Sequence, residues 1–342
     1  MAICFGSISF RMGTIALGFL ALSGMSGGPV LAAPDAANTI GPDECGECHK
    51  AEVEVWRGTH HHKTFQELPR REKAREIADK MDIRRIKNES LCLQCHFTQM
   101  INDSGEPDAV AGISCESCHS AGKAWNDLHS DYGGKDVTRE NEDPAHRDQR
   151  IAASRQAGMI QPSMIYDWAN NCFSCHTVPE EKLVNEGGHP PGSKFELVSW
   201  SQGEIRHNVW YNDGKSNPEA TGDQKRVMAV VGQMLDLEHA LRGVAKATAR
   251  GDYAVAMAGR AKSAAQNIKK ISDSASTPEI AAVLDVAGGV KLTLGNADAL
   301  NAAADEVAKQ AKAFVANNDG SGLAGVDGMI PGPDRYKGSP AR

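Results

Sequence analysis

Aromatic side chains are scarce in this chain of 342 residues, in which Phe, Trp and Tyr together make up 5%. A chain with so few large apolar rings struggles to build a large core, unless a cofactor supplies apolar surface. Basic residues are also in the minority, since 37 Lys and Arg stand against 44 Asp and Glu and the formal net charge is −7. No basic stripe follows the chain, so nucleic acid is not an expected partner.

Long apolar runs are missing as well, and the longest lies near the N-terminus. Arg11, the apolar residues 14–22 and a run of small residues up to Ala33 follow the order of an export signal. Cleavage after Ala32 is favoured, because cleavage one residue later would leave a proline first. A membrane anchor would need about twenty apolar residues. We predict that residues 1–32 are a signal peptide and that the mature chain is periplasmic and not membrane-spanning.

Cysteines form a regular pattern. Of the nine, eight fall into four C-x-x-C pairs, and a histidine follows each pair directly. The four motifs are Cys45, Cys48 and His49; Cys92, Cys95 and His96; Cys115, Cys118 and His119; and Cys172, Cys175 and His176. C-x-x-C-H is the attachment motif of c-type haem. Cysteines three residues apart on a helical turn reach the two vinyl groups of the porphyrin, and the adjacent histidine gives the iron its proximal nitrogen.

Three other interpretations of paired cysteines are weaker. Disulfides suit an exported protein and zinc ribbons use C-x-x-C pairs, but neither needs a histidine after each pair. A redox dithiol would need one pair only. Four chance placements, with 12 histidines in 342 residues, have a probability on the order of one in a million. The sequence therefore predicts four covalently attached haems c, whose porphyrins would supply the missing core.

Eight further histidines decide what the iron atoms can do. They are His60, His61, His62, His129, His146, His189, His207 and His239. A second histidine on an iron gives a closed, low-spin centre suited to electron transfer, whereas an empty position lets small molecules bind. There are enough histidines to close all four sites, so their number alone does not separate a carrier from an enzyme.

Four stretches carry a family resemblance. They are Cys45-Gly-Glu-Cys-His-Lys50; Trp56-Arg-Gly-Thr-His60-His61; Gly112-Ile-Ser-Cys-Glu-Ser-Cys-His119, with His129 ten residues later; and Asn171-Cys-Phe-Ser-Cys-His176. Over about residues 41–210 the chain resembles the tetrahaem cytochrome c-554 family of ammonia oxidation, whose members receive electrons from hydroxylamine oxidation. The resemblance implies three haems with two histidine ligands and one five-coordinate haem at the second motif. It does not cover the C-terminal third of the chain.

Distal ligands follow from this resemblance position by position. It implies that His61 and His129 are two of them, and that the third lies beyond the fourth motif. Of the three histidines there, His207 is preferred to His239 because tryptophans flank it, and His189 in a Gly-Gly-His-Pro-Pro-Gly loop is the alternate. The remaining histidines, His60, His62, His146 and His239, are expected at the surface or beside the ligands.

The second motif has no matched distal partner, so the resemblance implies an open iron there. His60, His62 or His189 could still fill the position. Met100 follows His96 too closely to reach the opposite face.

The pattern along the chain predicts a mainly α fold. Residues 33–211 are expected to form the tetrahaem domain, with little regular core of its own. Within it, residues 67–86 are expected to form a charged helix, and residues 102–110 and 131–150 are expected to be loops. A polar linker follows at residues 212–223.

Alanine-rich heptads follow the linker and form four apolar stripes. The stripes are Val227, Val231, Met234, Leu241 and Val244; Tyr253, Met257, Ala261, Ala264, Ile268 and Ile271; Ile280, Val283, Leu284 and Val290; and Leu300, Val307, Ala311 and Phe314. Thr277-Pro278 is a start signal for the third stripe, and Asn296 opens the fourth. We predict a haem-free domain of four antiparallel helices at residues 224–317, followed by an extended Gly/Pro-rich tail at residues 318–342.

Two classes of function remain. The first is a periplasmic carrier that passes electrons between redox partners, such as a periplasmic or membrane oxidoreductase, quinol or a cytochrome c. The second is an enzyme that acts on nitric oxide, hydroxylamine or nitrite at an open haem at Cys92 and Cys95. The carrier is preferred because it needs only the haems, and no residue identifies a proton donor. A weaker third option makes the helical region a docking subunit of a larger complex.

Overall fold

Helices make up most of the regular structure, as predicted. The computed structural model describes residues 33–209, 212 and 214–341, and the predicted signal peptide at residues 1–32 lies outside the described residues. None of the helices in the described ranges is long and apolar enough to cross a membrane.

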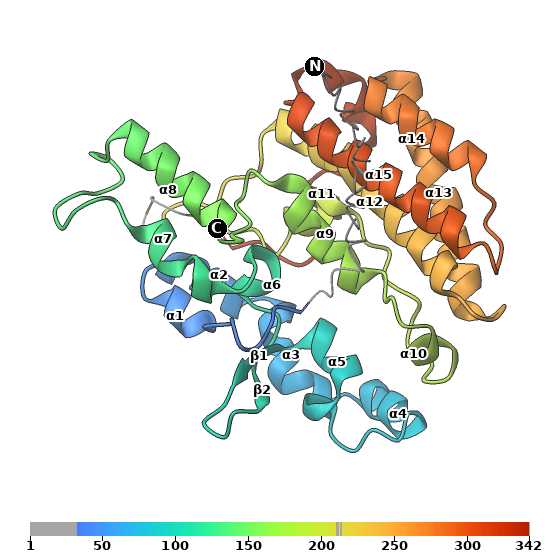
Figure 1. Ribbon diagram of the computed structural model, residues 1–342, viewed down its shortest axis with the longest axis horizontal. Coiled ribbons are helices and arrows are strands. Elements are labelled where there is room, and N and C mark those ends of the chain that lie inside the picture. Colours follow the sequence, from blue (N-terminus) through green and yellow to red (C-terminus); the bar gives the residue numbers. More distant parts are fainter. Residues whose placement is uncertain (1–32, 210–211, 213, 342) are drawn as a thin grey trace, which may run out of the picture. The chain divides into compact units, whose positions relative to one another are not determined.

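Short helices joined by loops form the part of the chain that contains the four motifs (Figure 1). They are α1 (Pro42–Gly46), α2 (Lys50–Arg57), α3 (His60–Glu67), α4 (Glu72–Lys80), α5 (Ser90–His96), α6 (Cys115–His119), α7 (Asn126–Ser130), α8 (Pro144–Gln156), α9 (Ile165–His176), α10 (Glu181–Asn185) and α11 (Leu197–Ser201). Between α5 and α6, β1 (Thr98–Ile101) and β2 (Pro107–Ala111) pair as an antiparallel hairpin. Beside the second motif a small apolar cluster forms from Ala78, Ile86, Leu93, Phe97 and Ala109.

The charged helix predicted over residues 67–86 is shorter in the structure, where it corresponds to α4, Glu72–Lys80. A short 3-10 turn, Leu68–Arg70, separates α3 from α4, because Pro69 has no N–H to continue the hydrogen bonds of α3. After α4, Asp82 adopts a positive φ of 56°, which ends the helix.

Both predicted loops contain regular structure. Residues 107–110 of the first belong to β2, whose opening Pro107 is tolerated at the start of an edge strand. In the second, α8 begins at Pro144, and the Asp143 side chain accepts hydrogen bonds from Ala145 N and His146 N, both at 3.0 Å. Asp at the N-cap followed by Pro at the first helical position is a common start of a helix. The prediction of a loop over residues 131–150 overlooked this signal.

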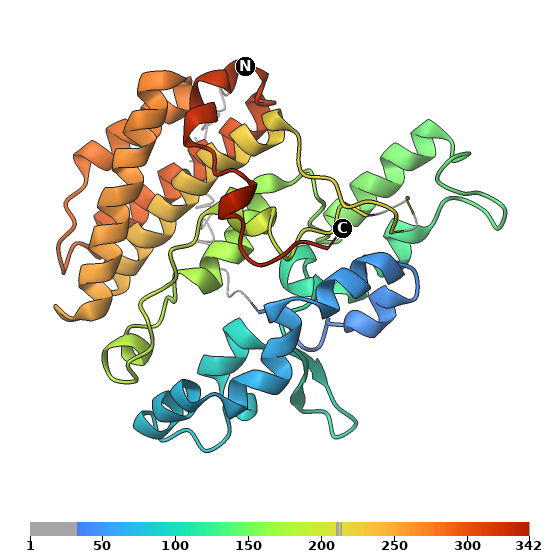
Figure 2. The ribbon, with the colours of Figure 1, turned by 180° about the vertical axis from the view of Figure 1, so that it is seen from behind.

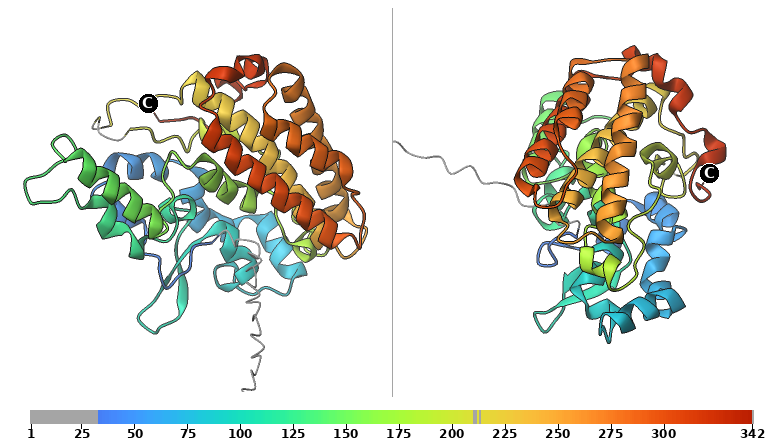
Figure 3. Two further views of the ribbon diagram at one scale, coloured as in Figure 1. Left: turned by 45° about the horizontal axis from the view of Figure 1, so that its top comes forward. Right: turned by 90° about the vertical axis from the view of Figure 1, so that its right-hand side faces the viewer.

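The four predicted stripes lie on four helices of the C-terminal part, except that Val290 of the third stripe follows the last residue of its helix. These helices are α12 (Gly222–Lys246), α13 (Asp252–Ser274), α14 (Pro278–Gly289) and α15 (Ala297–Asn317). α12 starts with a capping box, in which the Thr221 hydroxyl accepts from Gln224 N and the Gln224 side chain accepts from Thr221 N. α12 packs against α13 and α15, and α14 packs against α15, so the four lie alongside one another (Figures 2 and 3). The stripe residues of α12, such as Val231 and Met234, are fully buried between them.

The largest apolar core joins these helices to the fourth motif. Tyr166, Ala169 and Phe173 of α9 belong to the same buried cluster as the α12 to α15 stripes. The Tyr166 hydroxyl also donates a hydrogen bond of 2.8 Å to the Glu238 carboxylate on α12. α12 therefore supports the helix that carries Cys172, Cys175 and His176.

The C-terminal segment is not the extended tail that its glycines and prolines predicted. Residues Ser321–Met329 form short 3-10 turns with a kink at Leu323, and Leu323 and Val326 are buried. The guanidinium of Arg226 on α12 donates hydrogen bonds to both carboxylate oxygens of Asp327, at 2.6 and 2.8 Å. Leu323 and Val326 belong to the same apolar cluster as the helices, and burial of these two side chains favours the folded segment.

Candidate haem sites

The C-x-x-C-H motifs lie on short helical turns. α5, α6 and α9 each end at the motif histidine, so the two cysteines of each lie one turn apart on the same helix. In the first motif, Cys45 lies in α1 and His49 caps α2, and a hydrogen bond of 3.0 Å from His49 N to Cys45 O keeps the turn helical. Among the described residues, none of the eight motif cysteines is joined to another in a disulfide.

Every motif histidine faces a second histidine from elsewhere in the chain. The ring centroids are 6.2 Å apart for His49 and His129, 6.2 Å for His61 and His176, 6.3 Å for His96 and His189, and 6.3 Å for His119 and His207. Rings in van der Waals contact would lie closer together, and rings in a chance arrangement would not repeat one spacing four times.

This spacing fits one metal ion between two imidazoles. Two metal–nitrogen bonds of about 2 Å each, together with the distance from nitrogen to ring centre on both sides, add to about 6 Å. The residues present would therefore suit haem: at each motif two cysteines could attach it and two imidazoles could bind its iron.

Hydrogen bonds at Nδ1 turn the other ring nitrogen towards the partner. Nδ1 of His119 donates to Ile160 O at 2.8 Å, Nδ1 of His207 to Ile205 O at 2.7 Å, and Nδ1 of His189 to Pro190 O at 2.9 Å. Nδ1 of His129 likewise donates to Asn126 O. A carbonyl oxygen can only accept, so each of these rings carries its proton on Nδ1 and leaves the Nε2 lone pair for a metal.

Burial keeps the motif histidines neutral. It lowers the pKa of His96 and of His119 to about 4, and that of His176 to about 3. A neutral imidazole has the free lone pair that iron requires, whereas an imidazolium has none.

The motifs also lie next to one another. α1, which carries Cys45, packs against α6, which carries Cys115 and Cys118. Sγ of Cys175 lies 3.9 Å from the carbonyl oxygen of Gln94, which stands between the two cysteines of the second motif. The first motif thus contacts the third, and the second contacts the fourth. The side-chain amide of Asn171, beside the fourth motif, donates to Cys118 O at 3.3 Å and links the third motif to the fourth.

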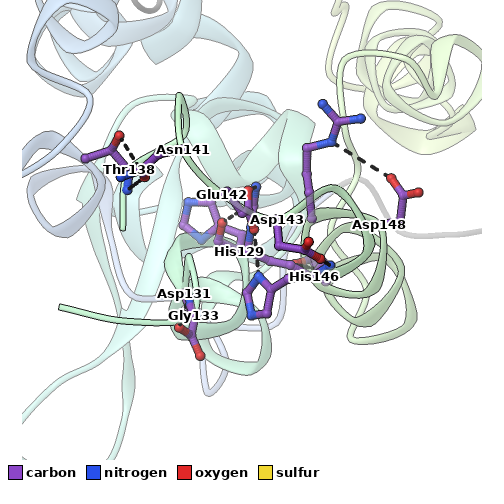
Figure 4. Close-up of polar contacts among 12 residues, drawn as sticks. His129, Asp131, Gly133, Thr138, Asn141, Glu142, Asp143, His146 and Asp148 are labelled. Carbon is purple, nitrogen blue, oxygen red and sulfur yellow. Dashed lines mark hydrogen bonds and ion pairs between the residues drawn. The ribbon is translucent and has the colours of Figure 1, made fainter. Parts of the chain in front are cut away.

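An ion-paired cluster holds the segment that carries His129 (Figure 4). Arg150 donates to both carboxylate oxygens of Glu142, at 2.7 and 2.6 Å, and to His129 O at 2.7 Å. Nδ1 of His146 lies 2.8 Å from the same carboxylate. The guanidinium of Arg150 is the main reason that the pKa of Glu142 falls to about 2.

The comparisons with known proteins agree with the first part of this arrangement. The family model described as cytochrome c554 and c-prime matches residues 44–120. Cytochrome c-554 of Nitrosomonas europaea is 28% identical over 100 residues, which are 27% of this chain and 43% of the relative. In part, the chain resembles the cytochrome c554 family. It spans less than half the length of this curated relative, and no solved structure matches it.

The stretch matched to the cytochrome c554 family holds three motifs and His61, and everything else in the site lies outside it. The fourth motif and the facing histidines His129, His189 and His207 come from later in the chain. Within the structure, His61 pairs with the fourth motif, and His207 pairs with the third. Sequence spacing gave no sign of these partners, because each pair joins distant stretches.

The four remaining histidines have other contacts. Nδ1 of His60 lies 2.8 Å from a Glu204 carboxylate oxygen, and the ring of His62 packs edge-on against Trp56 with centroids 4.6 Å apart. His146 contacts Glu142, and Nε2 of His239 lies 2.8 Å from Asn170 Oδ1.

Proposed function

We propose that the chain is an exported tetrahaem c-type cytochrome that carries electrons between redox proteins. The observation that carries the proposal is the repeated spacing of 6.2 to 6.3 Å between each motif histidine and a second histidine. A disulfide or zinc framework would not require four facing imidazole pairs of one spacing.

The eight motif cysteines would attach the cofactor through thioether bonds to its vinyl carbons. His49, His119 and His176 would bind iron from the motif side, and His129, His207 and His61 from the opposite side. Haem c, when bound, supplies a one-electron iron couple whose potential depends on its axial ligands and their hydrogen bonds. The carbonyl partners at Nδ1 hold the rings in one orientation, so an electron can arrive and leave without much rearrangement of the ligands.

The contacts between motifs support electron transfer through the molecule. The packing of α1 on α6, the approach of Cys175 to Gln94 and the hydrogen bond from Asn171 to Cys118 support a close placement of neighbouring attachment sites. Cofactors held at these positions would form a continuous series, with the first and second motifs at its ends. We propose that redox proteins, such as an oxidoreductase or a cytochrome c, dock at these ends.

The domain division belongs to the same proposal. Residues 33–211 would hold the haems, with a linker at residues 212–223 and a four-helix domain without cysteine at residues 224–317. The buried contact between Tyr166 and Glu238 supports a scaffold role for these helices. Residues 1–32 would direct export, which suits the attachment of c-type haem outside the cytoplasm.

The test is the haem content of the mature protein. We expect an intact mass that corresponds to four haems on a chain that begins after residue 32, and a haem-to-protein ratio of four. The reduced protein should pass electrons to a small periplasmic cytochrome c in stopped-flow mixing. A ratio below four in fully matured protein would overturn the proposal.

A further inference from the structure

We infer that His189 is the second axial ligand of the haem at Cys92 and Cys95, so this iron is closed. The inference rests on the proposed function, and it departs from the open iron that the family resemblance implies. The ring of His189 lies 6.3 Å from that of His96, the same spacing as in the other three pairs.

The ring of His189 is oriented for metal binding. Its Nδ1 donates to Pro190 O at 2.9 Å, so Nε2 carries the lone pair. The two prolines that follow restrict the backbone on one side of the histidine. His189 is thus presented in the same way as His207, which also donates from Nδ1 to a nearby carbonyl.

Glycines allow the tight approach that brings His189 into place. Gly188 has a φ of +73°, a left-handed conformation that favours glycine. A Cβ at Gly187 would lie 2.6 Å from Leu183 O, so a side chain there would push the loop away. His189 N then donates to Leu183 O at 3.1 Å, which fixes the loop on the end of α10.

The haem-free helices hold α10 in turn. Asn185 Oδ1 accepts from Tyr253 N at 3.0 Å, at the start of α13. The Glu181 carboxylate accepts from Thr248 N at 2.8 Å, just before that helix. Farther along the loop, Arg260 of α13 donates to Ser193 O at 2.5 Å. Every one of these residues lies outside the stretch matched to the cytochrome c554 family. The contacts that position His189 therefore come from parts of the chain that the family match does not cover.

An apolar cavity of about 230 Å³ lies at this pair. Its lining residues include Ile77, Ile83, Ile86, Leu183, Cys92, His96 and His189. Apolar walls between a thiol and two imidazoles suit a porphyrin, and Arg71 and Lys73 at the same cavity suit its carboxylates. The other histidines that could have closed the site have different partners, since His60 contacts Glu204 and His62 packs on Trp56.

A closed iron changes what the site can do. Nitric oxide or carbon monoxide could bind only after His189 leaves. The hydrogen bond of His189 N to α10, and that of Asn185 to the start of α13, oppose its leaving. The second site then serves electron transfer, as the other three do, and the enzyme that acts on small nitrogen species loses its open position.

Spectroscopy of the full-length holoprotein tests the assignment. We expect four low-spin haems in the wild-type protein by electron paramagnetic resonance, and no carbon monoxide bound to the ferrous form. His189→Ala should convert one haem in four to high-spin and bind one carbon monoxide per chain. Added imidazole should restore the low-spin signal of this variant, which a purely structural defect would not allow. Val255→Ala, which changes an exposed side chain of α13 away from the pairs, is the control and should leave all four signals unchanged.

Two results would overturn the assignment. One is a wild-type protein that already has a high-spin haem that binds carbon monoxide, and the other is a His189→Ala protein with four low-spin haems. If that variant does not fold, the wild-type spectrum and the Asn185→Ala variant test the assignment of His189. Asn185→Ala removes the hydrogen bond between α10 and Tyr253, so it should increase carbon monoxide binding at one haem. The haem count separates the two proposals: fewer than four haems defeats the tetrahaem function, whereas four haems with one open iron defeats only the role of His189.

Discussion

Backbone carbonyl groups orient four of the candidate ligands by accepting a hydrogen bond from Nδ1. His119, His129, His189 and His207 all donate from Nδ1 to a backbone oxygen within the folded chain. Such partners fix the tautomer and increase the basicity of the ligating nitrogen. His129 has further support, because Arg150 binds its carbonyl oxygen and the Glu142 carboxylate at the same time.

Glu142 makes this support dependent on pH. Its pKa is lowered from 4.5 to about 2, first by Arg150 and also by His146, so the folded state favours the carboxylate. The stabilisation is complete above about pH 4.5 and is lost as the pH falls towards 2. We expect Glu142→Gln to lower the thermal midpoint at pH 7, and the difference from wild type to shrink as the pH falls from about 5 to 2. Asp148→Asn, whose exposed carboxylate lies 3.9 Å from Arg147, is the control and should change the midpoint little. Parallel pH profiles of wild type and Glu142→Gln would contradict this prediction.

At the scale of helices, α13 has a buried face and an exposed face that can be compared directly. Ile268 is 1% exposed and belongs to the large apolar core, whereas Val255 on the same helix is 61% exposed. We expect Ile268→Ala to lower the free energy of unfolding by about 2–5 kcal/mol through lost burial and a residual cavity. Val255→Ala should change it by less than about 0.5 kcal/mol. Denaturant titration followed by circular dichroism measures both, and equal costs would contradict the assigned faces.

These same helices show which parts of the fold local sequence can predict. Their stripes and caps lie within one helix each, so Thr277, Pro278 and Asn296 were sufficient to place the starts of α14 and α15. The C-x-x-C-H motifs could also be identified from the sequence, because each lies within five consecutive residues. Histidine pairs depend on how distant helices pack, and no local pattern carries that information. The folded C-terminal segment was missed for the same reason, since Leu323 and Val326 are buried only by helices elsewhere in the chain.

For the whole molecule, the four motifs differ in how much of the fold depends on them. Cys172 packs against the core that α9 shares with α12 to α15, whereas Cys48 of the first motif is exposed. Loss of the haem at the fourth motif would leave an apolar space beside this core. The helices that share the core would then be less stable.

We therefore compare two double variants, Cys172→Ala with Cys175→Ala and Cys45→Ala with Cys48→Ala. Each should lose one covalent haem by intact mass. In the fourth-motif variant, the helical circular dichroism should unfold at a clearly lower temperature, because α9 and α12 share one apolar core. In the first-motif variant the helical transition should stay close to that of wild type, and the loss should be confined to the haem absorbance. Equal shifts in the two variants would mean that the helices do not depend on the fourth site more than on the first, and the scaffold role proposed for α12 would fail.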